Sequence, residues 1–216
     1  MNEAKKTGLF WVVAAVVLVA TTIVTWPKSA VDDSETLGTL INEPLFSTFK
    51  DPLSVASMKI VTFDEEQGKL ANFEVSKDPE TGDWTIITRK GYPADAVEQM
   101  KNAANALVDL KVLDIVPCTR EDHDDLGVVE PKMEDLSVGD EGVGRLVTFR
   151  DASKNIVASL IIGDRVKDNE EQLYVRIPGQ DPVYVVALDD APLTTKFQDW
   201  IEDDLLKLSS IDIDQM

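Results

Sequence analysis

The hydrophobic positions of this chain form one long continuous run near the N-terminus and a series of short alternating segments after it. Residues 8–26 contain no charged side chain. A helix rises about 1.5 Å per residue, so a run of this length approaches the roughly 30 Å thickness of a bilayer core. Trp11 and Trp26 stand near its two ends, where aromatic rings favour the membrane interface. The pattern predicts a transmembrane anchor over residues 8–26.

The charges beside this run indicate how the anchor is oriented. Basic side chains are retained on the cytoplasmic side of a membrane, and Lys5 and Lys6 directly precede the run. We therefore expect a single-pass protein of the inner (cell) membrane, with residues 1–7 in the cytoplasm and the bulk of the chain outside it. The alternative is a cleaved secretory signal, which needs a small residue three positions before the cut. A cut after Ala20 would place Leu18 there, so the pattern favours the anchor.

A segment of mixed character, residues 27–52, follows the anchor. Its first part is polar and acidic, which is typical of an extended tether. Its second part carries large apolar side chains that a free linker would not need, namely Leu40, Ile41, Leu45, Phe46 and Phe49. The sequence therefore predicts a tether that is partly docked on the globular part.

Two periodicities alternate along the globular part, residues 53–208. Apolar residues at every second position predict antiparallel strands at 58–63, 73–76, 84–88, 112–116, 145–149, 156–162, 173–177 and 183–187. Apolar residues at three- and four-residue spacing predict two main amphipathic helices, at 95–110 and 193–208. Asp95 is the expected N-cap of the first helix. This order predicts an α+β fold of antiparallel β-meanders packed against helices, with residues 209–216 starting a further strand or module.

Charge and cysteine content narrow the classes of partner. The formal net charge is −19, and such a chain is repelled by nucleic acid and by anionic lipid headgroups. We therefore expect no nucleic-acid partner. Cys118 is the only cysteine, so the fold has no internal disulfide. It is expected to be a small core residue, and a bond between two chains is the alternative.

The sequence contains no recognisable catalytic or metal-binding motif. His123 is the only histidine and lies in the acidic run 121–125. That run has neither the three or four suitable ligands of a zinc site nor the Asp spacing of a calcium loop, so we expect it to be a solvated surface. No Ser or Cys stands in the context of a nucleophile. The glycine-rich loop 138–144 contains Asp140 and Glu141, which would repel phosphate. We expect no enzymatic activity, no cofactor and no metal.

Several short motifs, taken in order, resemble one family. They are Trp84 in a strand, Tyr92-Pro93-Ala94-Asp95, Asp125-Leu126-Gly127-Val128 followed by Pro131, Leu160-Ile161-Ile162-Gly163-Asp164, Tyr174-Val175-Arg176, Val183-Tyr184-Val185 and Asp199-Trp200. Together they resemble domain of unknown function 4340, a family of membrane-anchored bacterial proteins, over about residues 63–208. The resemblance carries over no catalytic residue, and the motif residues are interpreted as turn, cap and core positions.

The resemblance also implies a class of function. Some members of that family are linked with gliding-motility-type ABC transport components, which implies an extracytoplasmic accessory role. We therefore expect a protein-interaction module that is accessory to an ABC-type exporter or to an envelope assembly. Two alternatives stay open. One is a ligand-binding or enzymatic domain that acts on an envelope component and has a deep polar pocket. The other is a structural subunit that stacks into a homo-oligomer.

Overall fold

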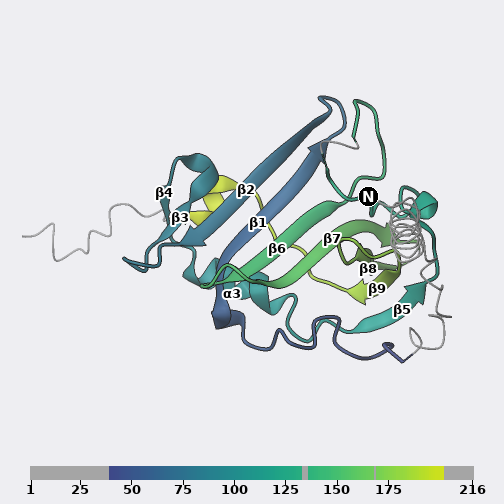
Figure 1. Cartoon of the computed structure of the whole chain (residues 1–216), viewed down its shortest axis with the longest axis horizontal. Coiled ribbons are helices and arrows are strands. Elements are labelled where there is room, and N and C mark those ends of the chain that lie inside the picture. Colours follow the sequence, from purple (N-terminus) through teal and green to yellow (C-terminus); the bar gives the residue numbers. More distant parts are fainter. Residues whose placement is uncertain (1–38, 133–135, 168, 202–216) are drawn as a thin grey trace, which may run out of the picture. The chain divides into compact units, whose positions relative to one another are not determined.

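Nine strands form one antiparallel sheet in the described part of the computed structural model of this chain (Figure 1). That part comprises residues 39–132, 136–167 and 169–201. The strands lie in the order β4-β3-β2-β1-β6-β7-β8-β9-β5. Their bounds are β1 Val55–Asp64, β2 Lys69–Lys77, β3 Trp84–Ile86, β4 Tyr92–Ala94, β5 Val112–Val116, β6 Arg145–Asp151, β7 Ile156–Val166, β8 Asn169–Arg176 and β9 Val183–Ala187. All eight strands predicted from alternation are present, and β4 is an additional strand that was not predicted.

The expected fold class, α+β with two main amphipathic helices, is wrong. Within the described residues one α-helix occurs, α3 at Val97–Asn105, against a nine-stranded sheet. The second predicted helix, 193–208, contains only the 3₁₀ helix η4, Phe197–Trp200, in its described part. Three-residue spacing of apolar side chains fits a single 3₁₀ turn as well as an α-helix. Here the indole Nε1 of Trp200 donates to Thr194 O at 3.1 Å, which closes a tight turn where a helix was expected.

The first predicted helix is present but shorter than 95–110. Its N-cap is Ala96, which makes no side-chain capping hydrogen bond, so the prediction of an Asp95 cap is wrong. The backbone N–H of Asp95 instead donates to Trp200 O at 3.0 Å. At the other end Asp109 has a φ of 55°, a left-handed conformation that ends helical geometry. The helix therefore starts after Asp95, whose backbone N–H is used in a hydrogen bond with the C-terminal segment.

The main core lies on one face of the sheet. Met58 and Ile60 of β1 stand opposite Phe149 and Val147 of β6, and all four are fully buried. Helix α3 covers this face with three buried side chains, Met100, Ala103 and Ala104. Phe49, Leu193 and Trp200 complete the cover. Burying one large apolar side chain contributes roughly 1.5–3 kcal/mol, so this face supplies most of the stability.

The other face of the sheet is covered by the long connection between β5 and β6. Val128 of this connection packs on Ile161 of β7 and Val183 of β9, and the three form a second, smaller apolar cluster. Because both faces are covered at this end, polar side chains of β8 that point away from the main core are also enclosed. The pocket described below lies beside this second cluster.

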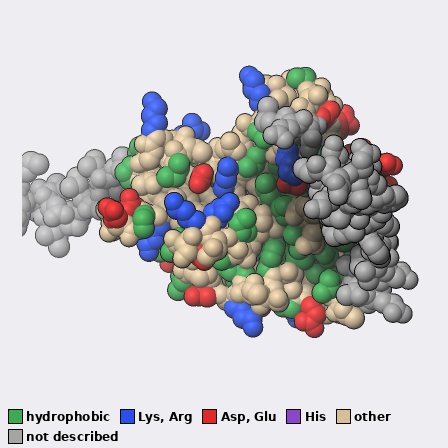
Figure 2. Space-filling view, in the orientation of Figure 1, with side chains coloured by type: hydrophobic (Ala, Val, Ile, Leu, Met, Phe, Trp, Pro, Cys, Tyr) green, Lys and Arg blue, Asp and Glu red, His purple; other side chains and the backbone are tan. Residues whose placement is uncertain are grey.

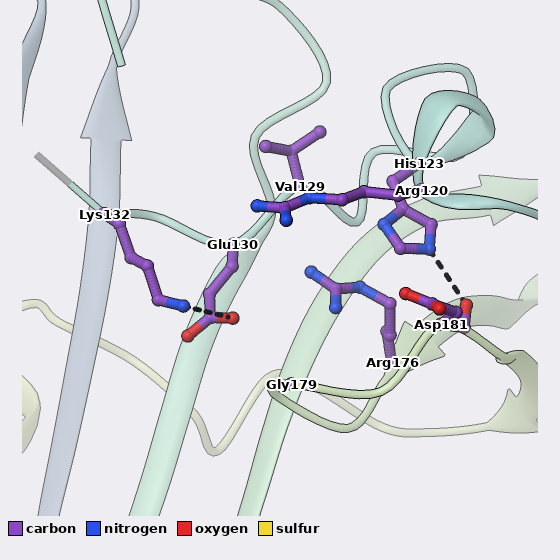
Figure 3. A pocket seen from close by; sticks show the side chains of 8 residues that line it. All are labelled: Arg120, His123, Val129, Glu130, Lys132, Arg176, Gly179 and Asp181. Carbon is purple, nitrogen blue, oxygen red and sulfur yellow. Dashed lines mark hydrogen bonds and ion pairs between the residues drawn. The ribbon is translucent and has the colours of Figure 1, made fainter. Parts of the chain in front are cut away.

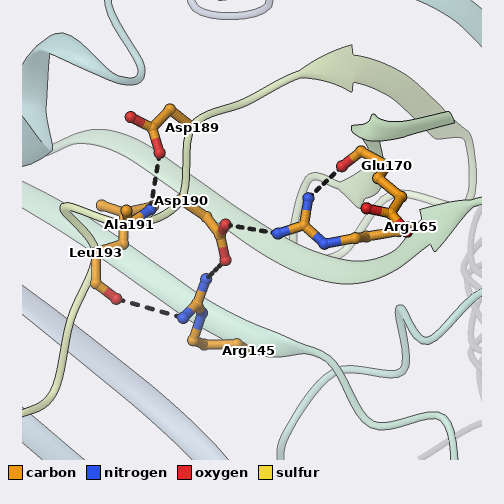
Figure 4. A network of polar contacts seen from close by, with 7 residues as sticks. All are labelled: Arg145, Arg165, Glu170, Asp189, Asp190, Ala191 and Leu193. Atoms are coloured by element: carbon orange, nitrogen blue, oxygen red, sulfur yellow. Dashed lines mark hydrogen bonds and ion pairs between the residues drawn. The ribbon is translucent and has the colours of Figure 1, made fainter.

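A network of charged groups fixes the segment that follows β9 (Figure 4). Arg145 Nη2 of β6 lies 2.6 Å from Asp190 Oδ2, and Arg165 Nη2 of β7 lies 3.2 Å from Asp190 Oδ1. Arg165 also donates to the carbonyl of Glu170, and Arg145 Nη1 donates to Leu193 O at 3.3 Å. These contacts direct the chain back across the main core toward β4. On the face seen in Figure 2, acidic and basic side chains are interspersed.

The chain divides into two units, residues 1–36 and 37–216, and every described residue belongs to the second. No helix among the described residues is long and apolar enough to span a bilayer. The predicted anchor 8–26, its flanking Lys5, Lys6, Trp11 and Trp26, and the predicted further strand at 209–216 lie outside the described residues. Of the predicted tether, Phe49 is buried and stacks on Phe149 with ring centroids 6.3 Å apart.

Candidate functional site

A pocket of about 180 Å³ lies beside the second apolar cluster (Figure 3). It is bounded by the end of β8, the turn that joins β8 to β9, and residues 120–132 of the connection between β5 and β6. Its ionisable lining consists of Arg120, His123, Glu130, Lys132, Arg176 and Asp181. Segments about 50 residues apart in the chain therefore place three cationic and two anionic side chains around one small space.

Arg176 forms the floor of the pocket. It is the last residue of β8 and is only 5% exposed, because it stands on the sheet face that the connection covers. Its Nε donates to Val128 O at 2.9 Å and its Nη1 donates to Gln180 O at 2.8 Å. Burial lowers the pKa of this guanidinium from its ordinary value, and the carboxylates of Glu130 and Asp181 act in the opposite direction.

The second terminal nitrogen of Arg176 is left for the pocket. No hydrogen bond joins Arg176 Nη2 to any described residue. Among the described residues, no side-chain nitrogen or oxygen that is sealed from solvent lacks a hydrogen-bond partner. Nη2 must therefore be reachable from the pocket, and Figure 3 shows the guanidinium directed into it.

Arg120 and His123 come from a short 3₁₀ turn, η3 at Arg120–Asp122. The Asp122 carboxylate accepts from Thr119 N at 2.8 Å and from Thr119 Oγ1 at 2.9 Å, which forms a capping box at the start of this turn. His123 is 2% exposed, and its Nε2 lies 2.9 Å from Asp181 O. Because a carbonyl can only accept, Nε2 carries the proton. The prediction of a solvated surface is therefore wrong for His123.

Three glycines hold the connection tightly against β7. A Cβ added at Gly163 would lie 2.4 Å from Leu126 O, and one added at Gly144 would lie 2.8 Å from Gly127 O. Gly127 itself has a φ of 68°. This approach allows Asp164 N to donate to Leu126 O at 3.1 Å. This backbone contact holds Val128 O in the position where it accepts from Arg176 Nε. The glycines of two sequence motifs, Gly127 and Gly163, therefore support the back of the pocket.

The motif residues near the β4 end of the sheet lie away from the pocket. At the β4 end of the sheet, Trp84 stands opposite Ala94, and Pro93 stands opposite Thr85. The rings of Tyr92 and Phe197 meet edge-on with their centroids 5.1 Å apart, and the ring centroids of Trp200 and Phe73 are 5.6 Å apart. These contacts are structural.

The two tyrosines of the motifs lie on opposite faces of the sheet. Tyr184 is buried in the main core, where burial raises the pKa of its phenol, and Tyr174 packs with the second cluster. Both residues therefore serve packing.

Sequence reasoning missed the ionisable lining of this pocket, except that His123 had been considered. One signal was available, because Arg176 is a charged residue within the predicted strand 173–177 and within one of the family motifs. Of the described residues, no group of three or more His, Cys, Asp or Glu side chains is arranged to hold a metal ion. Cys118 is half-buried and lies beside the second cluster, and burial raises the pKa of its thiol.

One family model, described as Domain of unknown function (DUF4340), matches residues 84–216. The matched span is more than half of the chain and includes every residue that lines the pocket. Searches of the curated proteins and of the solved structures found no match.

Proposed function

The chain belongs to the DUF4340 family of domains of unknown function, and from this premise we propose that it is a recognition module that binds another protein of the cell envelope. The observation that carries the proposal is the pocket around Arg176. An arginine residue that is 5% exposed and keeps one terminal nitrogen free is a costly group to maintain without a ligand.

The geometry favours binding over chemistry. Hydrogen bonds hold Arg176 from the backbone of two separate segments, and the ring of His123 is bonded to Asp181 O. Such rigid, multiply held groups suit the recognition of a complementary group on a partner. Lys132, whose side chain is 53% exposed, lies at the accessible rim of the pocket.

The place of action is part of the same proposal. The uncharged run 8–26, with Lys5 and Lys6 before it, supports attachment to the inner membrane with the described residues on the extracytoplasmic side. The transport links of some members of the family support an ABC-type exporter or an envelope assembly as the partner.

Site-specific photo-crosslinking in cells tests this proposal. A photoreactive amino acid would replace Lys132 in the full chain, and a matched variant would carry it at Lys101 of α3. The two side chains are similarly exposed, at 53% and 45%, but α3 covers the opposite face of the sheet. We expect a defined envelope protein to be captured from position 132 and not from position 101. Capture from both positions alike, or from neither, contradicts the proposal.

A second function, binding of a small molecule of the envelope, would use the same pocket. A volume of about 180 Å³ is below the 300–1,000 Å³ range of most drug-sized ligand sites, so it fits only a small compound. Native mass spectrometry of the full chain released from cell membranes distinguishes the two. A retained small molecule supports the second function, and a retained protein supports the first.

A further inference from the structure

We infer that the pocket around Arg176 and Arg120 binds a single carboxylate group, supplied by an acidic side chain or the C-terminus of a protein partner. The inference rests on the proposed function for the nature of the partner. It adds the chemical group that is recognised and the residues that recognise it.

The two arginines lack a carboxylate of their own. Ion pairs among the described residues join Lys101 to Glu98, Lys132 to Glu130, and Arg145 and Arg165 to Asp190. Within the same residues Arg120 and Arg176 form none, and the guanidinium of Arg120 makes no hydrogen bond. Figure 3 shows both guanidinium groups extending toward the side of the pocket where Glu130 and Lys132 lie.

Burial makes this arrangement unusual. An enclosed cation is costly unless an anion offsets the water it has lost. The direct partners of Arg176 are two neutral carbonyls; the carboxylates of Glu130 and Asp181 favour its charge without forming an ion pair with it, and the nearby charge of Arg120 opposes it. An anion bound between the two guanidinium groups would offset both the cost of burying Arg176 and the repulsion between the two cations. The whole chain carries a formal charge of −19, so two unpaired arginines on one small pocket are not explained by an excess of basic residues.

The charge of the lining specifies a monoanion. Arg120, Lys132 and Arg176 are cationic, whereas Glu130 and Asp181 are anionic, so the ionisable lining has a formal charge of +1 with His123 neutral. A carboxylate balances this charge. A phosphate dianion would exceed it and would face the two carboxylates at close range.

The hydrogen-bonding geometry of arginine also suits a carboxylate. Guanidinium groups form paired, charge-assisted hydrogen bonds with a carboxylate. Lys132 already pairs with Glu130 at 3.1 Å, which leaves the two arginines as the recognising groups.

The test is a titration of the full chain in mild detergent, followed by ¹H–¹⁵N correlation of the arginine Nε–H groups. The probe is N-acetylglycinate, which mimics a peptide C-terminus. The comparison probes are N-acetylglycinamide, of the same shape without the charge, and inorganic phosphate. We expect N-acetylglycinate to produce saturable shifts at Arg120 and Arg176, N-acetylglycinamide to produce none, and phosphate to bind more weakly.

Arg120→Gln is the decisive variant, because Arg120 makes no hydrogen bond whose loss would disturb the fold. Arg89→Gln is its control, since Arg89 is exposed on the 3₁₀ helix η2, Ile87–Arg89, and its loss changes the net charge equally. Arg120→Gln should weaken the binding of N-acetylglycinate about tenfold, the loss expected for one charge-assisted hydrogen bond. Arg89→Gln should leave it unchanged.

Three results overturn the inference: equal binding of the amide, tighter binding of phosphate, or equal effects of the two substitutions. Failure here is distinguishable from failure of the proposed function. Carboxylate binding without a captured protein contradicts the proposed function. Capture of a protein from position 132, together with no binding of N-acetylglycinate, contradicts the inference but not the proposed function.

Discussion

Gly163→Ala probes the contact on which the back of the pocket depends. The added Cβ would lie 2.4 Å from Leu126 O and 2.8 Å from Gly127 O. Both atoms are backbone, so neither can move away by a side-chain rotation. Gly163 does not have a left-handed backbone conformation, so the effect of the substitution is purely steric.

The expected loss can be worked out from these contacts. Overpacking costs about 1–3 kcal/mol, and the upper value applies because two backbone carbonyls are displaced. The displacement also breaks the hydrogen bond from Asp164 N to Leu126 O, 3.1 Å long, which contributes about 1 kcal/mol. Ala restricts the unfolded chain more than Gly does, and this offsets roughly 0.4–1 kcal/mol of the loss in stability. We therefore expect a net loss of about 3 kcal/mol in the free energy of unfolding.

Thermal unfolding followed by near-ultraviolet circular dichroism measures this loss. For a chain of this size, about 3 kcal/mol corresponds to a fall in Tm of roughly 6–12 °C. Gly91→Ala is the control, because Gly91 has a φ of 71° and no atom within 4 Å of an added Cβ. Its cost is the left-handed strain alone, about 1 kcal/mol. If Gly163→Ala lowers Tm no more than Gly91→Ala does, the tight approach of the connection to β7 is refuted.

Three further predictions concern other parts of the molecule. Trp200→Phe removes the donor to Thr194 O but keeps an aromatic ring in the core, so urea denaturation should show a loss of about 1–2 kcal/mol; no loss would contradict the importance of this bond. Alkylation of Cys118 by iodoacetamide should rise at a higher pH in the folded chain than in urea, because burial raises the pKa of the thiol; coincident pH profiles would contradict this. Asp122→Asn should destabilise the fold at neutral pH, because hydrogen bonds from Thr119 lower the pKa of Asp122 and favour its ionised form. This contribution is present above the unfolded value of about 3.9 and is lost as pH falls through the lower folded value, so melting curves of the variant and the natural chain should converge in acid.

Alternation along the chain was sufficient to locate eight of the nine strands in the described residues. Segment 183–187 was predicted at the bounds that β9 has, since every second side chain points to the main core. Sequence spacing was less decisive for helices. Side chains at 197 and 200 are three apart, and this spacing does not distinguish a 3₁₀ turn from an α-helix.

The pocket could not be predicted from the sequence because it depends on strand order. Arg176 meets Val128 only because the connection between β5 and β6 crosses the sheet face on which Arg176 stands. No local pattern indicates that β5 pairs with β9, about 70 residues further along, rather than with a nearer strand. The same holds for His123. Its acidic neighbours in the sequence suggested an exposed side chain, whereas the folded chain places its ring against the distant backbone carbonyl of Asp181. The membrane anchor stays a prediction.

The position of β1 in the sheet affects how this family should be divided into folding units. The family match begins at residue 84, after β1 and β2, yet β1 pairs with β6 and β2 pairs with β3. A protein truncated at that boundary would lose the two strands that join the halves of its sheet. It would expose Val147 and Phe149 beside an unpaired strand edge, which promotes aggregation. The shortest piece that folds by itself must therefore start before Val55, well ahead of the first residue by which relatives are recognised.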